Sequence, residues 1–163
     1  MKRIFLDMDG TLARFNVPNA LNRFNEEEGF FANLKAYKGI EAINQLCCDY
    51  TEAYIISASP HKKADIDKIE WLSKYLPNIE FENIILCRLG ENKAKVIKNK
   101  CNINIDNTCY LLDDYTKNLI EWEQQGGKGI KRLTKVSDNS RKLWKGLELK
   151  DLGKLAELVG YGI

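Results

Sequence analysis

The chain has 163 residues, of which 44% are hydrophobic and 29% are charged, the proportions of one ordinary globular domain rather than of a disordered chain. Its 25 basic and 23 acidic residues leave a net charge of only +2, so the basic stripe that would hold a stable nucleic-acid partner is not expected. No apolar run is long enough to span a bilayer, which argues against a membrane partner.

The cysteines and the single histidine bear on location and on metal chemistry. The chain has five cysteines, an odd number; Cys47 and Cys48 are adjacent, and there is no C-x-x-C pair. With His61 as the only histidine, a zinc site is not expected. The first apolar run reaches an aspartate too early for a signal peptide, and the pattern as a whole predicts reduced thiols in a cytoplasmic protein.

Apolar runs of strand length alternate with segments of helical period along most of the chain. In chain order we expect a strand at 4–6, a helix at 39–48, a strand at 53–56, a helix at 62–76, a strand at 84–87, a helix at 92–100, a strand at 109–112, a helix at 116–125, a strand at 129–133 and a closing helix at 149–159. The helix at 62–76 should bury a stripe formed by Ile66, Ile69, Leu72 and Leu76. This alternation predicts an α/β fold in a single domain over residues 1–163, with a parallel sheet covered by helices on both faces.

The segment 12–38 does not follow this rhythm. It is rich in aromatic residues for a connector, with Phe15, Phe24, Phe30, Phe31 and Tyr37. A connection of this length inside a compact domain usually serves as a lid or a binding insert. We therefore expect a short cap inserted after the first strand at about residues 16–38, with a short helix within 16–28 that starts near Pro18.

Oxygen-bearing side chains follow several of the predicted strands. Asp7, Ser57 and the pair Asp113–Asp114 each come directly after an apolar run. Ligands of open α/β sheets bind at the carboxyl ends of the strands. These side chains are therefore expected to meet at one edge of the sheet.

The run FLDMDGT places Asp7 and Asp9 one residue apart, so both carboxylates can face one ligand if the segment is extended. Gly10 relieves the backbone at the turn, and Thr11 offers a hydroxyl group. Phosphoryl transfer needs a nucleophile, a cation that neutralises the phosphate and a proton donor for the leaving oxygen. Two neighbouring carboxylates can divide these tasks when one is ionised and the other carries a proton.

Four segments resemble the motifs of the haloacid dehalogenase-like (HAD) phosphatase superfamily. DMDGT at 7–11 is similar to the first motif, and IISAS at 55–59 is similar to the second. Lys93 in GENKAKVI resembles the lysine of the third motif, and LLDD at 111–114 resembles the acidic fourth motif. The resemblance runs from residue 4 to about residue 115 and implies the Rossmann-like HAD fold.

The resemblance also implies how the matching residues act on a phosphate monoester. Asp7 would attack phosphorus and become a transient aspartyl phosphate. Asp9 would protonate the leaving oxygen and then deprotonate the hydrolytic water. Ser57 and the ammonium group of Lys93 would hold the phosphate oxygens.

A magnesium site follows from the same resemblance. Mg²⁺ would be bound by Asp7, the main-chain carbonyl of Asp9, and Asp114, while Asp113 would orient Lys93 or a metal-bound water. Ligation by oxygen atoms alone, with some waters retained, is what Mg²⁺ prefers.

Several positions have a competing interpretation. Ser59 competes with Ser57 for the phosphate. Lys95 competes with Lys93, because a lysine in a charged helix is usually solvated; Lys93 is favoured because it begins the helix nearest the strand ends. The Asp113–Asp114 pair also suits the N-terminal cap of the following helix, a role that can coexist with metal binding.

Within the superfamily, the chain most resembles the 5'(3')-deoxyribonucleotidases. DMDGTLARF at 7–15 is similar to their opening segment, FFANLKAYKGIEAINQL at 30–46 is similar to the segment that returns from their cap, and the Ser59–Pro60 pair also fits. Two features depart from the family: Arg14 stands where an aspartate is usual, and the cap segment is shorter.

The closer resemblance implies a 5'-nucleotidase that acts on a small phosphate ester, a (deoxy)nucleotide, with Phe15 stacking on its base or sugar. The alternatives are a phosphatase for another small phosphate or for a polynucleotide end, and a non-catalytic phosphate-binding module. No pattern in the sequence specifies an oligomeric state.

Overall fold

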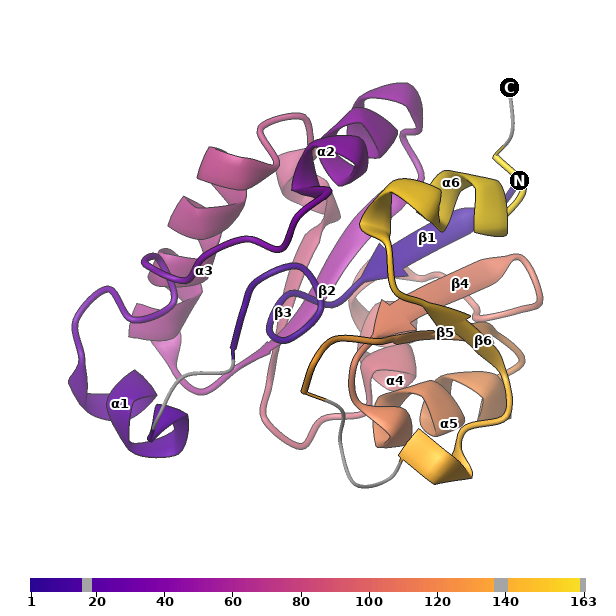
Figure 1. Ribbon diagram of the computed structural model, residues 1–163. Helices are drawn as coiled ribbons and strands as arrows, with labels where there is room; N and C mark the ends of the chain where they lie inside the picture. Colours follow the sequence, from indigo (N-terminus) through magenta and orange to yellow (C-terminus); the bar gives the residue numbers. More distant parts are fainter. Residues whose placement is uncertain (16–18, 137–140, 162–163) are drawn as a thin grey trace.

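The computed structural model describes residues 1–15, 19–136 and 141–161 and is drawn in Figure 1. In this part of the chain, one six-stranded sheet has the order β3-β2-β1-β4-β5-β6, and all of its strand pairs are parallel. The strands are β1 (Arg3–Leu6), β2 (Ala53–Ser59), β3 (Ile84–Arg88), β4 (Cys109–Asp113), β5 (Lys128–Arg132) and β6 (Leu147–Leu149). The predicted α/β class with a parallel sheet is confirmed, and the sheet has one strand more than the five that were predicted.

Helices cover both faces of this sheet. The α-helices are α1 (Ala20–Glu26), α2 (Ile40–Asp49), α3 (Lys62–Tyr75), α4 (Lys93–Cys101), α5 (Thr116–Gln124) and α6 (Leu155–Leu158). Short 3-10 turns lie at Phe81–Asn83, Arg141–Leu143 and Leu152–Lys154. Figure 1 shows α2, α3 and α6 on one side of the sheet and α4 and α5 on the other.

Alternate residues of the central strands build two separate hydrophobic cores. Ile4 and Leu6 of β1 are buried against the layer of α2 and α3, in a cluster that includes Trp71. Phe5, between them, is buried in the second cluster with Trp122 of α5. This alternation follows from the two-residue period of a strand, and it explains why a strand buried on both faces reads as a continuous apolar run.

The buried face of α3 differs from the predicted stripe. Leu72 and Leu76 are buried as expected, but Ile66 is 67% exposed. Besides Leu72, the buried positions of the helix are Ala64, Lys68 and Trp71. The prediction considered only apolar residues, whereas the bulk of the Trp71 ring and the inward-pointing Lys68 side chain determine which side of α3 faces the sheet.

The predicted closing helix at 149–159 is also wrong over its first half. Leu149 belongs to β6, and its carbonyl accepts a hydrogen bond from the Leu133 amide (2.8 Å). The Asp151 side chain then accepts from the Gly153 amide and caps a 3-10 turn, and only Leu155–Leu158 form an α-helix. The apolar spacing suits a helix, but pairing with the edge of β5 satisfies backbone groups that a helix starting at Leu149 would leave unpaired.

The segment between β1 and α2, which was predicted to form a cap, contains α1 in its described part. Its two ends lie side by side: the Arg14 amide donates to the Lys35 carbonyl (2.7 Å), and the Tyr37 amide donates to the Leu12 carbonyl (2.8 Å). Figure 1 shows α1 at the margin of the molecule, beyond α3 and away from the sheet. The expected short helix is thus present, while its predicted start near Pro18 falls outside the described residues.

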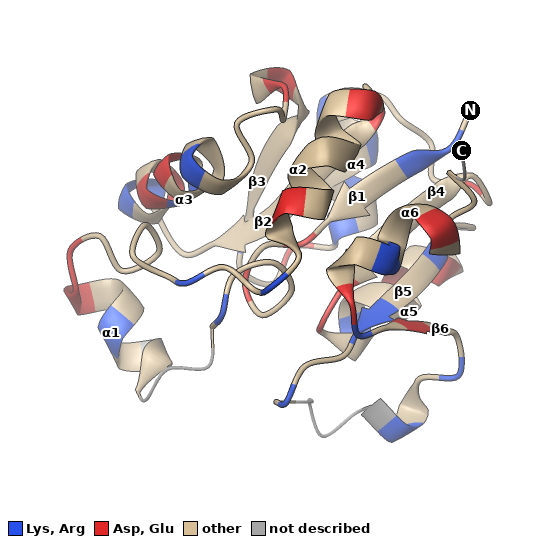
Figure 2. Ribbon diagram, turned by 45° about the horizontal axis from the view of Figure 1, so that its top comes forward, with Lys and Arg blue, Asp and Glu red and all other residues tan. Residues whose placement is uncertain are grey.

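Charges are mixed over the surface rather than gathered by sign. Figure 2 shows basic and acidic positions interspersed along α3, in keeping with the small net charge. Among the described helices, none combines the length and the apolar character needed to cross a membrane.

Candidate active site

The site lies where the order of the strands reverses. β1 is in the centre of the sheet, with β2 on one side and β4, which comes much later in the chain, on the other. Asp7 follows β1 directly, and its amide donates to the Leu112 carbonyl of β4 (2.9 Å). Asp113 is the last residue of β4, and Asp114 follows it. Such a switch point opens a crevice at the carboxyl ends of the two strands, the usual binding place in this class of sheet.

A tight loop after Asp7 turns the chain into the cap. The amides of Thr11, Leu12 and Ala13 all donate to the Met8 carbonyl, and Gly10 has a φ of 79°. A Cβ atom on Gly10 would lie 2.2 Å from Oδ2 of Asp114. Gly10 is therefore favoured by its left-handed backbone, and a larger residue there would have to displace the Asp114 carboxylate.

Asp7, Asp113 and Asp114 form a compact carboxylate cluster. One oxygen atom of each lies within 4.8 Å of the others. Thr11 joins two of them, because its hydroxyl lies 2.9 Å from Oδ2 of Asp7 and 3.3 Å from Oδ1 of Asp114. Burial, followed by the charges of Asp7 and Asp113, raises the pKa of Asp114 well above its usual range.

The chemistry of this cluster fits a magnesium ion. Three buried or half-buried carboxylates held this close repel one another, and a divalent cation would relieve that repulsion. The donors are oxygen atoms only, which suits Mg²⁺ rather than a metal that prefers nitrogen or sulfur.

Lys93, the first residue of α4, reaches into the cluster from the other side. Its ammonium donates to Oδ1 of Asp7 (2.6 Å) and to Oδ2 of Asp113 (2.7 Å). Burial alone would lower the pKa of Lys93, but the charges of Asp113 and Asp7 outweigh burial and hold the pKa above its usual range. Lys95 is exposed. Of the two candidate lysines, the geometry brings Lys93 into the site.

Asp113 serves both Lys93 and the start of α5. Its Oδ1 accepts from the Tyr115 amide (2.8 Å), and its Oδ2 accepts from Nδ2 of Asn118 (2.9 Å) in addition to Lys93. Burial raises the pKa of Asp113 to about 6, with the Asp7 charge adding to this shift and the Lys93 charge opposing it. The N-cap of α5 is Tyr115, which makes no side-chain capping bond, so the N-cap role predicted for the Asp113–Asp114 pair is wrong; Asp113 instead accepts from the amide of the N-cap residue.

Asp9 has a partner that sequence reasoning missed. Nζ of Lys68, on the buried face of α3, donates a short hydrogen bond to Oδ2 of Asp9 and further bonds to Oγ of Ser57 (3.0 Å) and the Ala58 carbonyl (2.7 Å). Burial raises the pKa of Asp9, and the Lys68 charge opposes this rise. The spacing of residues in α3 could have indicated this partner. Lys68 follows Ala64 by four residues and precedes Trp71 by three, which places all three on one face of the helix.

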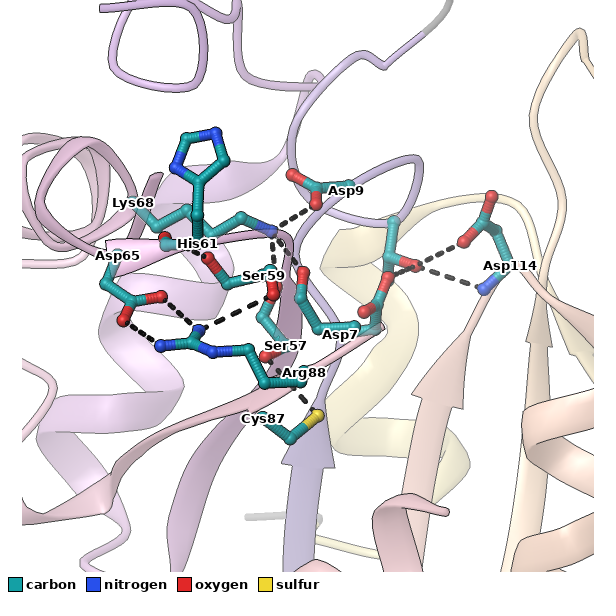
Figure 3. A network of polar contacts seen from close by, with 12 residues as sticks. Asp7, Asp9, Ser57, Ser59, His61, Asp65, Lys68, Cys87, Arg88 and Asp114 are labelled. Atoms are coloured by element: carbon teal, nitrogen blue, oxygen red, sulfur yellow. Dashed lines mark hydrogen bonds and ion pairs between the residues drawn. The ribbon is translucent and has the colours of Figure 1, made fainter. Parts of the chain in front are cut away.

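The two candidate serines face different neighbours. Both are fully buried near the end of β2, rather than just beyond it as predicted. The Ser57 hydroxyl contacts Lys68, whereas the Ser59 hydroxyl lies 3.4 Å from the His61 carbonyl. Figure 3 shows Ser57 on the side of Asp7 and Asp9. Of the two serines, only Ser57 is connected with Asp9 through Lys68, and neither serine is among the residues that line the cavity described next.

A cavity of about 230 Å³ lies beside Asp7, Asp9 and Lys93. Its polar wall includes Asp7, Asp9, Lys93, Asp113 and Asp114, and its apolar wall includes Phe15, Phe24, Phe31 and Leu89. The aromatic part of that wall comes from the cap: Phe15 stacks parallel to Phe31 with ring centroids 6.1 Å apart, and Phe24 lies 6.0 Å from Phe31. Phe30 and Phe31 are buried, as expected for residues that pack the cap, but Phe31 also contributes to the cavity.

Comparison with known proteins agrees with this geometry. A sequence profile of the family described as 5' nucleotidase, deoxy (pyrimidine), cytosolic type C matches residues 10–139. The chain belongs to this family. It is 26% identical over 121 residues to a 5'(3')-deoxyribonucleotidase of Bacillus subtilis, and 28% identical over 113 residues to one of Clostridium acetobutylicum. These alignments cover 74% and 69% of this chain but only 64% and 59% of the two relatives, so the chain spans less than two thirds of their length.

Solved structures show the same fold as this nucleotidase-family chain. A D,D-heptose 1,7-bisphosphate phosphatase from B. bronchiseptica superposes with a TM-score of 0.69 at 15% identity, covering 99% of both chains. A haloacid dehalogenase-like hydrolase from Streptococcus pneumoniae also gives 0.69, at 14% identity and with 97% of this chain covered. The predicted HAD fold is confirmed.

Proposed function

We propose that the chain is a magnesium-dependent phosphomonoesterase that acts through an aspartyl phosphate on Asp7 and uses a (deoxy)nucleotide as substrate. The observation that carries the proposal is the set of groups around one cavity. Asp7 and Asp9 line it together with Lys93 and Asp114, which gives a nucleophile, a proton donor, a cation and a metal ligand at one place. The family to which the chain belongs and the names of its relatives support the same chemistry.

In the first step, an oxygen of Asp7 attacks phosphorus, and the bond from phosphorus to the leaving oxygen breaks. Lys93 and Thr11 hold the two oxygens of Asp7 and so fix the direction of attack. Asp9 gives its proton to the leaving oxygen, and the burial that raises its pKa helps it to carry that proton beforehand.

In the second step, water attacks the phosphorus of the aspartyl phosphate, Asp9 takes a proton from this water, and Asp7 is released as a carboxylate. Ser57 donates to a phosphate oxygen, and Asp113 holds Lys93 in place. Mg²⁺ would be held by Asp7, Asp114 and the main-chain carbonyl of Asp9, and when bound it neutralises phosphate charge.

The shape of the cavity supports a substrate with an aromatic or sugar portion. The aromatic wall formed by Phe15, Phe24 and Phe31 faces the same space as the carboxylates. A phosphate held at Asp7 therefore places the rest of the molecule against aromatic rings, and base–aromatic stacking contributes roughly 1–3 kcal/mol. Such a substrate, together with free thiols at all five cysteines, suits the predicted cytoplasmic location.

A phosphate-release screen over deoxynucleoside and nucleoside monophosphates, sugar phosphates and an aryl phosphate, each with and without Mg²⁺, tests this proposal. We expect Mg²⁺-dependent release that is fastest from a mononucleotide. Phe15→Ala should lower kcat/KM for that nucleotide by about tenfold and affect the aryl phosphate less, because 1.4 kcal/mol corresponds to one decade.

Each other outcome of the screen has a definite meaning. Fastest release from a sugar phosphate would contradict the nucleotide assignment and leave the phosphatase chemistry in place. An equal loss of kcat/KM for the nucleotide and for the aryl phosphate in Phe15→Ala would show that Phe15 only packs the cap. Absence of release from every substrate would favour a phosphate-binding module without catalysis.

A further inference from the structure

Lys68 is a buried cation whose hydrogen bonds are all directed at protein groups. Its side chain is 0% exposed, and its three ammonium hydrogens can be assigned to Oδ2 of Asp9, Oγ of Ser57 and the Ala58 carbonyl. The ring of Phe31 covers the ammonium, with its centroid 4.5 Å from Nζ. No donor therefore remains for a substrate, unlike at Lys93, which lines the cavity.

The bond from Lys68 fixes one oxygen of Asp9, while the other oxygen forms no hydrogen bond with a described residue. Oδ1 of Asp9 is buried and has no hydrogen-bond partner among the described residues. Asp9 lines the cavity, and its side chain is 18% exposed through atoms other than Oδ1. An unpaired buried carboxylate oxygen costs free energy, so such an atom indicates a position where a further polar group is expected.

The same lysine orients Ser57. Because Oγ of Ser57 accepts from Lys68, the hydroxyl hydrogen of Ser57 is available to be donated elsewhere. The close-up in Figure 3 shows Lys68 Nζ between Asp9 and the end of β2, so one ammonium connects the loop after β1 with β2.

We propose that Lys68 is the positioning residue for proton transfer: it holds the carboxyl group of Asp9 at the cavity and is itself not a ligand of the phosphate. This inference rests on the proposed function, because it assumes that Asp9 gives a proton to the leaving group. It adds a residue of α3 to a site otherwise formed at the ends of β1, β2 and β4 and the start of α4. Through Phe31 it also connects the proton donor with the cap.

The dependence of the rate on the leaving group distinguishes this role from simple structural support. A nucleoside or another alkyl alcohol needs a proton on its oxygen to leave phosphorus, whereas 4-nitrophenolate leaves without one. A correctly placed general acid contributes about 10²–10⁴-fold. Lys68→Met should therefore lower kcat/KM for the alkyl phosphate by at least about 100-fold, and for 4-nitrophenyl phosphate by less than about tenfold.

A second readout separates the two chemical steps. The value of kcat/KM reports only the steps up to the formation of the aspartyl phosphate, whereas kcat also includes its hydrolysis. Because Asp9 must take a proton from water in that hydrolysis, kcat for 4-nitrophenyl phosphate should fall in Lys68→Met even though its kcat/KM changes little. Lys63→Met, an exposed lysine of the same helix, is the matched control and should leave both parameters unchanged.

The outcomes that would overturn the inference are distinct. Equal loss of kcat/KM on both substrates, with weaker inhibition by inorganic phosphate, would place Lys68 among the phosphate ligands. Equal loss of kcat/KM on both substrates, with unchanged inhibition by inorganic phosphate and a lower melting temperature, would show that Lys68 has a purely structural role. If Lys68→Met does not fold, Lys68→Gln, which keeps a donor but no charge, should show the same selective loss; failure of both to fold would also leave only a structural role.

The proposed function fails in a different way. In that case the unaltered protein releases phosphate from no substrate, or Asp7→Asn remains active. Lys68 would be wrongly assigned, with the proposed function intact, if the unaltered protein and Asp7→Asn behave as expected but the loss in Lys68→Met does not depend on the leaving group.

Discussion

Asp114 carries its charge at a cost in folding free energy. Its pKa is raised by burial and by the neighbouring Asp7 and Asp113. An acid whose pKa rises on folding favours the folded state below its ordinary pKa, and this contribution is lost as the pH rises through the raised value. At pH 7 without metal, the raised pKa of Asp114 therefore opposes folding, and Mg²⁺ should relieve that opposition.

Asp114→Asn should have opposite effects with and without metal. The melting temperature of the metal-free protein should rise by about 2–4 °C, which corresponds to roughly 1 kcal/mol in a chain of this size. Added Mg²⁺ should then stabilise the variant less than the parent, because ligand-linked stabilisation scales with affinity. Thermal melts over a Mg²⁺ series measure both, with Asp49→Asn at the exposed end of α2 as the control.

A full Mg²⁺-induced shift in Asp114→Asn would contradict the assignment of this residue to the metal site. A fall in the melting temperature without metal would show that the hydrogen bond from the Thr11 hydroxyl to the Asp114 carboxylate outweighs the repulsion.

Single residues differ in how far the sequence could indicate their roles. Asp7, Lys93 and Asp113 could be found because the ends of strands and the starts of helices converge in an α/β sheet, and the structure brings them together. Lys68 could not be found in this way, because most helical lysines are solvated. The cost of burying this one is offset by groups on other elements, chiefly Asp9 and Ser57.

At the scale of elements, the loop after β1 depends on Gly10. Gly10→Ala should destabilise the protein, since the left-handed backbone costs roughly 1–2 kcal/mol for a residue with a Cβ atom. It should also weaken Mg²⁺ binding, because that Cβ would meet the carboxylate of Asp114. Gly90→Ala is the matched control: its φ is 85°, and nothing lies within 4 Å of the added atom.

Melting temperatures of the two alanine variants with and without Mg²⁺ are the measurement. Gly90→Ala should show only the backbone cost and keep the shift caused by Mg²⁺, whereas Gly10→Ala should lose more stability and much of that shift. Identical behaviour of the two variants would show that the contact between Gly10 and Asp114 does not matter for the site.

Helices and strands were predictable where local pattern and tertiary packing agree. The helix α2 and the strands β1, β2 and β4 all begin within one residue of the predicted starts. The segment after β5 was not predictable, because Leu149, Leu152 and Leu155 have helical spacing while the open edge of β5 pairs with Leu149 as a strand. An edge that needs a partner is a property of the whole sheet and leaves no trace in a short window of sequence.

At the scale of the whole molecule, the site depends on strand order. The alternation of strands and helices predicts a parallel sheet, but it does not specify that β4 pairs with β1 rather than with β3. That pairing places Asp113 and Asp114 beside Asp7, more than 100 residues away in the chain. The order of the strands could be predicted only from the resemblance to the HAD superfamily.

The nucleophile is the central claim, and Asp7→Asn tests it most directly. The amide is nearly isosteric and can still accept from Thr11, so the fold should persist with a melting temperature close to that of the parent. It cannot attack phosphorus, so the rate of phosphate release from the best nucleotide at saturating Mg²⁺ should fall below about a hundredth of the parent rate. A folded Asp7→Asn variant that releases phosphate faster than this would contradict covalent catalysis by Asp7.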